Sequence, residues 1–311
     1  MEKLIKVKGM NRRRRAEKIF YWAMLALPLL QFCIFYIGVN FNSILLSFQS
    51  IEMDTTGNGG YIYSWVGFEN FAEVIRLCLN EYELVCSFGN SMMAYGIGLV
   101  FGTAPALLFS FYIYKKYPLG GFFKIVLFMP SLISAVAMVL IFKYFVENAY
   151  PAIMEALFNM QVEGLLANPD TTFATVIIYG VWLGFGGGIL MYLGAMNSIS
   201  ESVVEAAHLD GITPMKEFFK ITLPLIWPTL VTFLVSGIAG IFTNQLGLFT
   251  FFQDKANKSY YTYGYYMFLH TKAGMTEYPH VASMGLLMTL IVAPITLLAR
   301  YLLEKFGPSV D

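Results

Sequence analysis

Histidine and cysteine have the most versatile side-chain chemistry in this chain, because both bind metals and cysteine also forms disulfides. The three histidines, His208, His270 and His280, are far apart in the sequence, and no two cysteines have the CxxC spacing of a zinc site. We therefore expect no metal site and no cofactor. Cys78 and Cys86 are close enough in sequence to form a disulfide outside the cytoplasm or to remain two free thiols.

The motifs of common catalytic reactions are missing from the 311 residues. The sequence has no GxxxxGK[ST] loop for the phosphates of ATP, no HExxH zinc motif and no GxSxG nucleophile elbow. We therefore expect a protein that has no catalytic site of its own.

Two adjacent amides, Asn244 and Gln245, interrupt an apolar stretch near the end of the chain. A buried amide is costly unless it is hydrogen-bonded. Its partner can be a group on a neighbouring helix, or the hydroxyl of a ligand in a wet cavity. The sequence alone leaves both alternatives open.

The elements that position these residues are long apolar segments. Hydrophobic residues make up 57% of the chain and charged residues 13%, against roughly a quarter charged in soluble proteins. A stretch of about 20 apolar residues is long enough to span a bilayer as a helix. Such stretches occupy residues 20–48, 87–114, 122–145, 173–197, 224–250 and 280–303. We predict an all-α integral membrane protein with about six transmembrane helices, the first an uncleaved anchor.

The distribution of charge predicts the orientation of these helices. Eight Lys and Arg residues precede the first apolar stretch, and alternate loops carry most of the others, whereas the opposite loops carry Glu and Asp. By the positive-inside rule, both termini are cytoplasmic and the protein lies in a bacterial cytoplasmic membrane. The predicted organisation is a basic segment (1–19), a transmembrane domain (20–303) and a short tail (304–311). The net charge of zero gives no indication of a nucleic-acid partner.

The loop at residues 199–224 has the pattern of two short helices joined by a turn. Ser202 and Glu205 have the spacing of a capping box, and Gly211 is suited to the positive φ that ends a helix. Thr213–Pro214 has the types preferred at the N-cap and first position of a second helix. Such a loop is either an ordinary surface connection or a compact projection that a soluble partner can grip.

The order of residues in this loop resembles the EAA loop of ABC-importer permeases, specifically the binding-protein-dependent carbohydrate family of the maltose, lactose and multiple-sugar type. The matching residues are Glu205, Ala206, Ala207, Asp210, Gly211, Ile221, Leu223 and Pro224. Similar residues also occur at Val66–Phe71, at Met129–Pro130 and between Trp182 and Tyr192. The resemblance therefore covers nearly the whole chain.

The resemblance implies a type I ABC importer permease fold whose cytoplasmic loop is a coupling helix docked on a separate ATPase. The implied docking residues are Glu205, Ala206, Ala207, Asp210 and Gly211. The implied partners are a second homologous permease, two ATP-binding cassette ATPases, an extracytoplasmic solute-binding protein, a sugar substrate and membrane lipid. Transport would proceed by alternating access between two states of the helices.

The resemblance also indicates a substrate site at Asn244 and Gln245, with Phe249 as an aromatic platform for a sugar ring. On a continuous helix these two amides would point about 100° apart, so only one would face the path. We expect the glycine series Gly180, Gly184 and Gly188 to serve close helix packing. The alternatives are the same machinery for a polyol or glycerol phosphate, or a secondary transporter.

Overall fold

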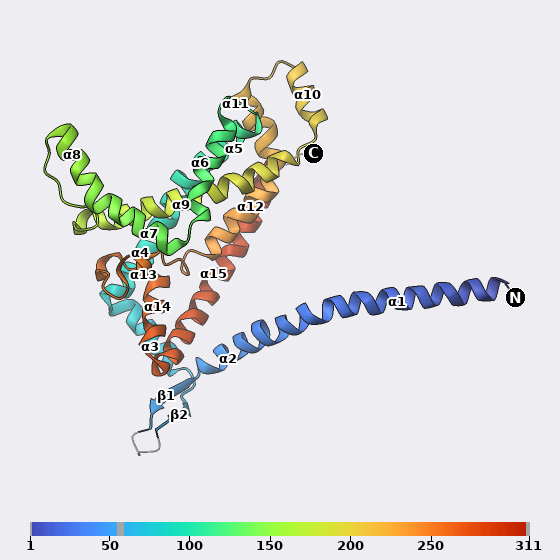
Figure 1. Cartoon of the computed structure of the whole chain (residues 1–311). Coiled ribbons are helices and arrows are strands. Elements are labelled where there is room, and N and C mark those ends of the chain that lie inside the picture. The colour runs from blue at the N-terminus through green and yellow to red at the C-terminus, as the bar shows by residue number, and fades with distance from the viewer. Residues whose placement is uncertain (1, 55–58, 309–311) are drawn as a thin grey trace. The chain divides into compact units, whose positions relative to one another are not determined.

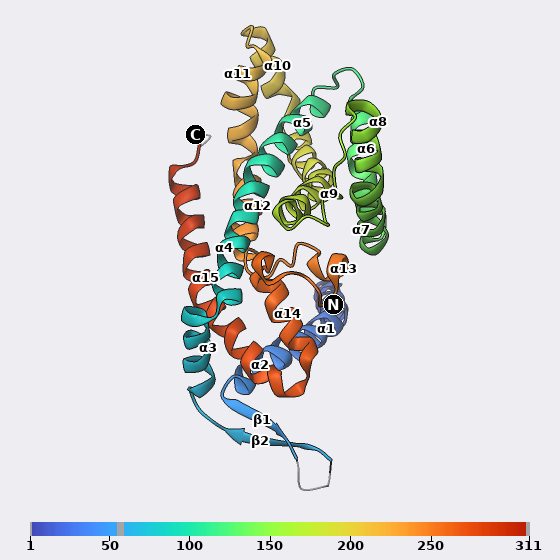
Figure 2. The ribbon, with the colours of Figure 1, turned by 90° about the vertical axis from the view of Figure 1, so that its left-hand side faces the viewer.

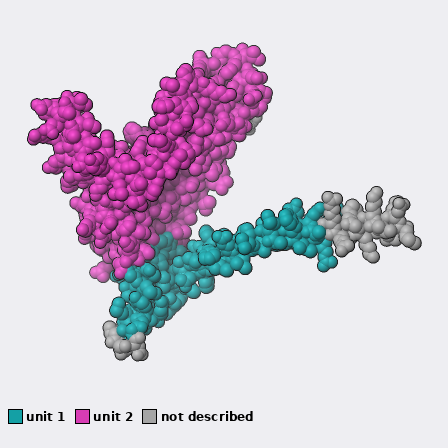
Figure 3. Space-filling view, in the orientation of Figure 1, with its two compact units in different colours: residues 1–74, 274–286 teal, residues 75–273, 287–311 magenta. Residues whose placement is uncertain are grey.

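The computed structural model describes residues 2–54 and 59–308, with side chains from residue 14 onward, and is mainly helical (Figure 1). The predicted basic side chains at residues 3–13 therefore lie outside the described part. The chain forms two compact units, which are described separately: residues 1–74 with 274–286, and residues 75–273 with 287–311 (Figure 3).

The α-helices are α1 (Glu2–Gln31), α2 (Val39–Leu46), α3 (Glu69–Asn80), α4 (Tyr82–Ile97), α5 (Ala104–Tyr114), α6 (Gly120–Leu132), α7 (Ala135–Tyr144), α8 (Tyr150–Phe158), α9 (Pro169–Asn197), α10 (Glu201–Leu209), α11 (Pro214–Glu217), α12 (Leu223–Ala239), α13 (Leu248–Phe252), α14 (Tyr263–Ala273) and α15 (Tyr278–Phe306). Wider π-helical turns continue several of them at Phe32–Gly38, Gly98–Thr103, Phe145–Ala149 and Phe218–Thr222. Short 3₁₀ turns lie at Lys258–Tyr260 and Met275–Glu277.

Six helical stretches in the described residues are long and apolar enough to cross a membrane, which agrees with the predicted number. They are Arg14–Leu46, Tyr82–Tyr114, Ala135–Phe158, Pro169–Asn197, Pro214–Ala239 and Met275–Phe306.

The predicted third span, 122–145, is wrong, because the chain breaks there into α6 and α7. Ile133 and Ser134 are extended, with ψ angles of 146° and 133°. The Ile133 N–H bonds to the Pro130 carbonyl, three residues back, so the helix tightens and stops soon after the proline. The long apolar helix begins only at Ala135, so the predicted span combined two separate helices.

In the unit formed by residues 1–74 and 274–286, one backbone carbonyl connects distant segments. The Asn70 amide donates to the Ser47 and Gln49 carbonyls, at 3.0 and 2.8 Å. The Ser283 hydroxyl lies 3.1 Å from the same Ser47 carbonyl and 2.8 Å from the Pro279 carbonyl of its own helix. Next to this junction lies an antiparallel hairpin of β1 (Gln49–Met53) and β2 (Tyr61–Trp65), in which Ile51 faces Tyr63. Residues 49–65 gave no sequence signal from which this hairpin was predicted.

The larger unit is built around α9, which packs against α5 and α6, with α12 alongside (Figure 2). The buried Ser110 hydroxyl on α5 lies between two carbonyl acceptors, Ala106 of its own helix at 2.6 Å and Ile189 of α9 at 3.1 Å. At Gly186, α9 lies so close to α6 that an added Cβ would meet the Leu127 carbonyl oxygen at 2.2 Å. The cysteines Cys33, Cys78 and Cys86 are free thiols.

Candidate functional site

The loop between α9 and α12 contains the two short helices that the sequence predicts, but the first begins earlier than expected. Helix α10 starts at Glu201 with Ser200 as its N-cap, so the predicted capping box of Ser202 and Glu205 is wrong. The Ser200 hydroxyl lies 2.8 Å from that of Ser202 and does not bond to the helix backbone. The capping pattern therefore identified the helix but misplaced its first residue.

Gly211 ends α10 in the predicted way. Its φ is +68°, its N–H bonds to the His208 carbonyl, and the Ile212 N–H bonds to the Ala207 carbonyl. These two bonds form a Schellman motif, which satisfies carbonyls at the helix end and needs a residue with positive φ. Thr213 is the N-cap of α11 with Pro214 following, as predicted.

The five proposed docking residues lie along this short helix and its turn. Glu205, Ala206, Asp210 and Gly211 are exposed, whereas Ala207 is buried at 6% exposure. Leu209 on the same helix is 89% exposed. The helix therefore presents both polar and apolar groups outward, while Ala207 anchors it.

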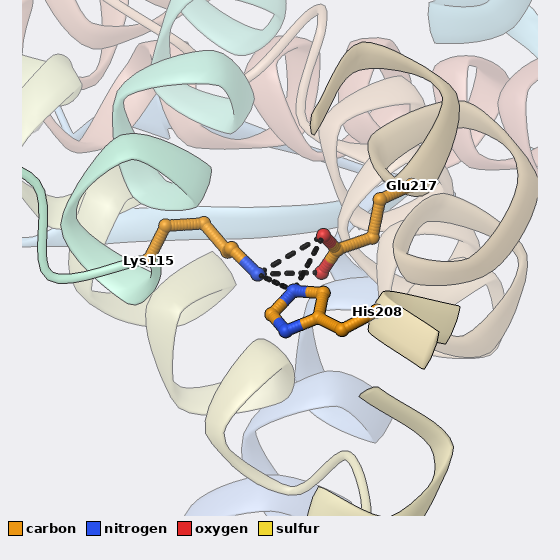
Figure 4. A network of polar contacts seen from close by, with 3 residues as sticks. All are labelled: Lys115, His208 and Glu217. Carbon is orange, nitrogen blue, oxygen red and sulfur yellow. Dashed lines mark hydrogen bonds and ion pairs between the residues drawn. The ribbon is translucent and has the colours of Figure 1, made fainter. Parts of the chain in front are cut away.

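A polar network that the sequence analysis missed lies beneath this helix (Figure 4). The Lys115 ammonium, at the end of α5, donates to both carboxylate oxygens of Glu217, at 2.9 and 3.0 Å. It also lies 2.8 Å from Nε2 of His208 on α10, which is 3.4 Å from Glu217. The Glu217 side chain is 2% exposed. Because one partner lies 102 residues away, sequence spacing gave no sign of this contact.

The amide pair lies outside any helix, contrary to the prediction of a continuous span through residue 250. Helix α12 ends at Ala239, and α13 begins only at Leu248. The Asn244 side chain accepts a hydrogen bond from the Leu246 N–H at 2.8 Å. Leu246 and Gly247 both have positive φ, 52° and 73°, which turns the chain sharply. The alternation of polar and apolar residues did not reveal this turn.

Asn244 lines a cavity of about 880 Å³ in the larger unit. Segments of α4, α7, α9 and α12 form the walls, and the turn after α12 contributes Asn244. Gln245 and Phe249 are not among the lining residues. The Phe249 ring packs against Phe268, with centroids 4.9 Å apart, and lies under the Lys272 ammonium at 4.2 Å.

The glycine series on α9 lines this cavity, and only part of it has the predicted role in close packing. A Cβ built at Gly188 would lie 3.5 Å from the Ala106 side chain of α5, whereas one built at Gly184 would meet no heavy atom of the described residues within 4 Å. A closer helix contact is made by Gly186, which lies outside the series. Glycine spacing alone does not distinguish a packed face from an open one, since both need small residues.

One residue of the cavity wall carries a buried hydroxyl that has no hydrogen-bond partner in the described part of the chain. Tyr179 is 3% exposed, and its hydroxyl forms no hydrogen bond with the described residues. Phe142 and Phe251 hold its ring, with centroids at 4.9 and 5.0 Å. The hydroxyl atom itself is buried, so a ligand in the cavity would reach it only after a local movement of the wall, and a hydroxyl without a partner is suited to a ligand that offers hydrogen-bonding groups.

These features define a multi-pass α-helical membrane protein with an internal cavity and a projecting loop of two short helices. Residues 94–311 match the family of binding-protein-dependent transport system inner membrane components. The match covers more than half of the chain, so the chain belongs to this family. It is an ABC importer permease subunit, and its homologues are transport permeases rather than enzymes.

Relatives and a solved structure agree with this family. A probable ABC transporter permease, the MG188 homolog of Mycoplasma pneumoniae, is 27% identical over 72% of this chain and 68% of its own length. The multiple sugar-binding transport system permease MsmF of Streptococcus mutans is 23% identical over 96% of this chain and 99% of its own length. The crystal structure of a bacterial ABC transporter involved in the import of the acidic polysaccharide alginate matches with a TM-score of 0.76 at 19% identity. The match covers 95% of this chain and 98% of the solved chain. The predicted type I permease fold is confirmed.

Proposed function

We propose that this permease subunit imports a sugar or oligosaccharide. The observation that carries the proposal is the chemistry of the cavity: the described lining residues include tyrosines, Ser, Thr and Asn244, but no Lys, Arg, Asp or Glu. A sugar presents hydroxyls to such polar groups and C–H faces to aromatic rings. The names of the relatives, which include a multiple-sugar permease, support this substrate class.

The second candidate, a phosphorylated solute such as glycerol phosphate, fits the cavity less well. Phosphate is recognised by Arg or Lys. The described lining supplies neither, so a neutral sugar or polyol is favoured. Within the cavity, Asn244 and Tyr179 are the polar groups that we assign to the substrate. A role for Gln245 and Phe249 would need the turn after α12 to rearrange, and it stays a prediction.

The energy for transport comes, in this proposal, from two separate ATPase subunits that dock on α10. The docking residues are Glu205, Ala206, Ala207, Asp210 and Gly211. A second homologous permease completes the membrane domain, and an extracytoplasmic solute-binding protein delivers the sugar. ATP and the binding protein favour an outward-open state, since a ligand shifts a balance only toward the state that it binds more tightly.

The proposed orientation follows from charge. The basic segment 1–19 and the tail 304–311 are cytoplasmic, residues 20–303 form the transmembrane domain, and the loop 199–224 faces the ATPases. The membrane is the bacterial cytoplasmic membrane.

Purification of the tagged chain in mild detergent from its native host, followed by identification of stoichiometric partners, tests the assembly. We expect a second permease and an ATPase. Reconstitution in liposomes with the solute-binding protein then tests the substrate, with uptake of labelled maltose, lactose and glycerol phosphate compared. Transport by the isolated chain without ATP would overturn the proposal in favour of a secondary transporter.

A further inference from the structure

The Lys115–His208–Glu217 network joins three elements of the larger unit that are distant in sequence. Lys115 caps α5, His208 lies in the last turn of α10, and Glu217 ends α11. The single carboxylate lies between two basic groups, at 2.9 Å from the Lys115 ammonium and 3.4 Å from the His208 ring (Figure 4).

The burial of this network makes it selective for one arrangement of the three elements. The Glu217 and Lys115 side chains are 2% and 12% exposed. A charge removed from water is tolerated only when its partner stays in place, so sliding α11 past α5 would leave a buried carboxylate unpaired. The next residue, Phe218, packs on Phe111 of α5 with ring centroids 5.1 Å apart. Polar and aromatic contacts therefore fix α11 to α5 at two adjacent points.

From α5 the contacts continue toward the cavity. Ser110 lies one turn before the end of α5, and its buried hydroxyl is shared between the Ala106 carbonyl of α5, at 2.6 Å, and the Ile189 carbonyl of α9, at 3.1 Å. Ile189 lies between Gly188 and Met191, which both line the cavity. A displacement of α5 therefore acts directly on the cavity wall.

We propose that Lys115 and Glu217 are positioning residues that pass movement of α10 to α5, and through Ser110 to the cavity face of α9. This inference rests on the proposed docking of an ATPase on α10. His208 adds the contact between α10 itself and the ion pair, so a movement of the docked helix that keeps this contact would also move the Lys115 ammonium.

The test uses the complex purified with its bound ATPase, in a chain whose three cysteines are replaced by serine and whose Met191 is replaced by cysteine. Met191 lies on α9, lines the cavity and is 55% exposed. The rate at which a water-soluble maleimide labels this cysteine is measured without nucleotide and with ATP plus vanadate. Retention of the ATPase is measured on the same samples.

We compare Glu217→Gln and Lys115→Met with the exchanged pair Lys115→Glu/Glu217→Lys. Lys116→Met is the matched control, because Lys116 is the exposed neighbour of Lys115. Couplings between sites commonly amount to 5–150-fold, so we expect about a tenfold change in labelling rate between the nucleotide states of the unaltered network. The single variants should keep the ATPase but respond by about twofold or less, and the exchanged pair should recover at least half of the response.

A full nucleotide response in Glu217→Gln would overturn the inference, as would an exchanged pair that fails to recover it. Loss of the ATPase from the single variants would also overturn it, because the network would then shape the docking surface rather than transmit its movement. A chain with the unaltered network that retains no ATPase would instead overturn the proposed function, and this result is distinguished by occurring before any substitution in the network.

Discussion

The Glu217 carboxylate accepts two hydrogen bonds from the Lys115 ammonium across 102 residues of sequence, and both side chains are almost fully enclosed. Removing one member of such a pair leaves the other charge uncompensated, which typically costs about 3–5 kcal/mol. Because Lys115 keeps 12% exposure and can reach water, we expect Glu217→Ala to lower the free energy of unfolding by about 2–3 kcal/mol. Chemical unfolding in detergent measures this difference.

The control for that measurement is Glu205→Ala in the same loop. Glu205 is exposed, and exposed substitutions away from special features usually change stability by less than about 0.5 kcal/mol. Equal effects of the two substitutions would show that Glu217 is not a buried, paired carboxylate.

The second prediction concerns Gly211, in the turn that ends α10. Among the described residues, no heavy atom lies within 4 Å of a Cβ built at this residue, so its φ of +68° is what opposes a side chain there. Gly211→Ala should therefore weaken the turn by about 1–2 kcal/mol. In this variant, hydrogen exchange at the backbone amides of residues 211 and 212 should become faster, because both amides bond to carbonyls of α10 in the parent protein.

Gly211→Asn is the control, because asparagine visits the left-handed region more readily than alanine. The amide exchange rate of this variant should lie between that of the parent protein and that of Gly211→Ala. Alanine and asparagine variants that exchange as slowly as the parent would contradict the Schellman geometry.

The sequence predicted those features that depend on local patterns. Helix α10, its glycine stop and the Thr213–Pro214 start of α11 follow from residue types within one or two turns. The count of membrane helices likewise follows from apolar length. The break at Ile133 was missed because hydropathy does not change there, and only the backbone shows that α6 and α7 are separate.

Features that depend on long-range contacts could not be predicted. Glu217 lies next to Lys115 only because α11 packs on α5, and Asn244 reaches the cavity only because α12 ends five residues before it. The resemblance to a transporter family identified the segment that contains Asn244. It did not reveal the buried Tyr179 hydroxyl, whose importance comes from the absence of a partner among the described residues.

Two glycines on α9 make a matched pair that tests the helix packing. A Cβ at Gly186 would lie 2.2 Å from the Leu127 carbonyl oxygen, a backbone atom that cannot rotate away. A Cβ at Gly184 would meet no atom of the described residues within 4 Å. We expect Gly186→Ala to destabilise the protein by about 1–3 kcal/mol through overpacking. Gly184→Ala should be neutral or stabilising by up to about 1 kcal/mol, because alanine favours a helix. Equal unfolding midpoints for the two variants would contradict the α6–α9 contact.

Tyr265 predicts how the stability of the larger unit responds to alkaline pH. Burial raises the pKa of this phenol to about 12, and its hydroxyl donates to the Gln253 carbonyl at 2.5 Å. The unfolded chain would lose this proton near pH 10, whereas the folded chain holds it to about pH 12, so stability is retained below pH 10 and falls between these values.

A series of thermal unfolding measurements in detergent from pH 8 to 12 checks this expectation. Tyr265→Phe should lower the unfolding temperature at pH 8, since it leaves the Gln253 carbonyl without its donor, but should flatten the decline above pH 10. If the unfolding temperature of Tyr265→Phe fell with pH as steeply as that of the parent, the Tyr265 phenol would be excluded as the cause of the alkaline loss of stability.

Tyr179→Phe separates binding from stability at the cavity. Its buried hydroxyl has no partner among the described residues, so removing it should leave the free energy of unfolding unchanged or raise it by up to about 1 kcal/mol. If the hydroxyl bonds to the transported sugar, the same change should raise KM for uptake about 5–10-fold, the equivalent of one neutral hydrogen bond.

Tyr95→Phe is a control for which we expect the reverse result, a loss of stability without a change in KM. The Tyr95 hydroxyl also belongs to a cavity-lining residue, but it already donates to the Leu234 carbonyl at 3.2 Å. Its removal should therefore cost about 1 kcal/mol of stability and leave KM nearly unchanged. The two variants thus give opposite patterns in unfolding and uptake. A Tyr179→Phe protein with unchanged KM would show that the sugar does not use this hydroxyl, and Asn244 would then be the remaining polar group assigned to it.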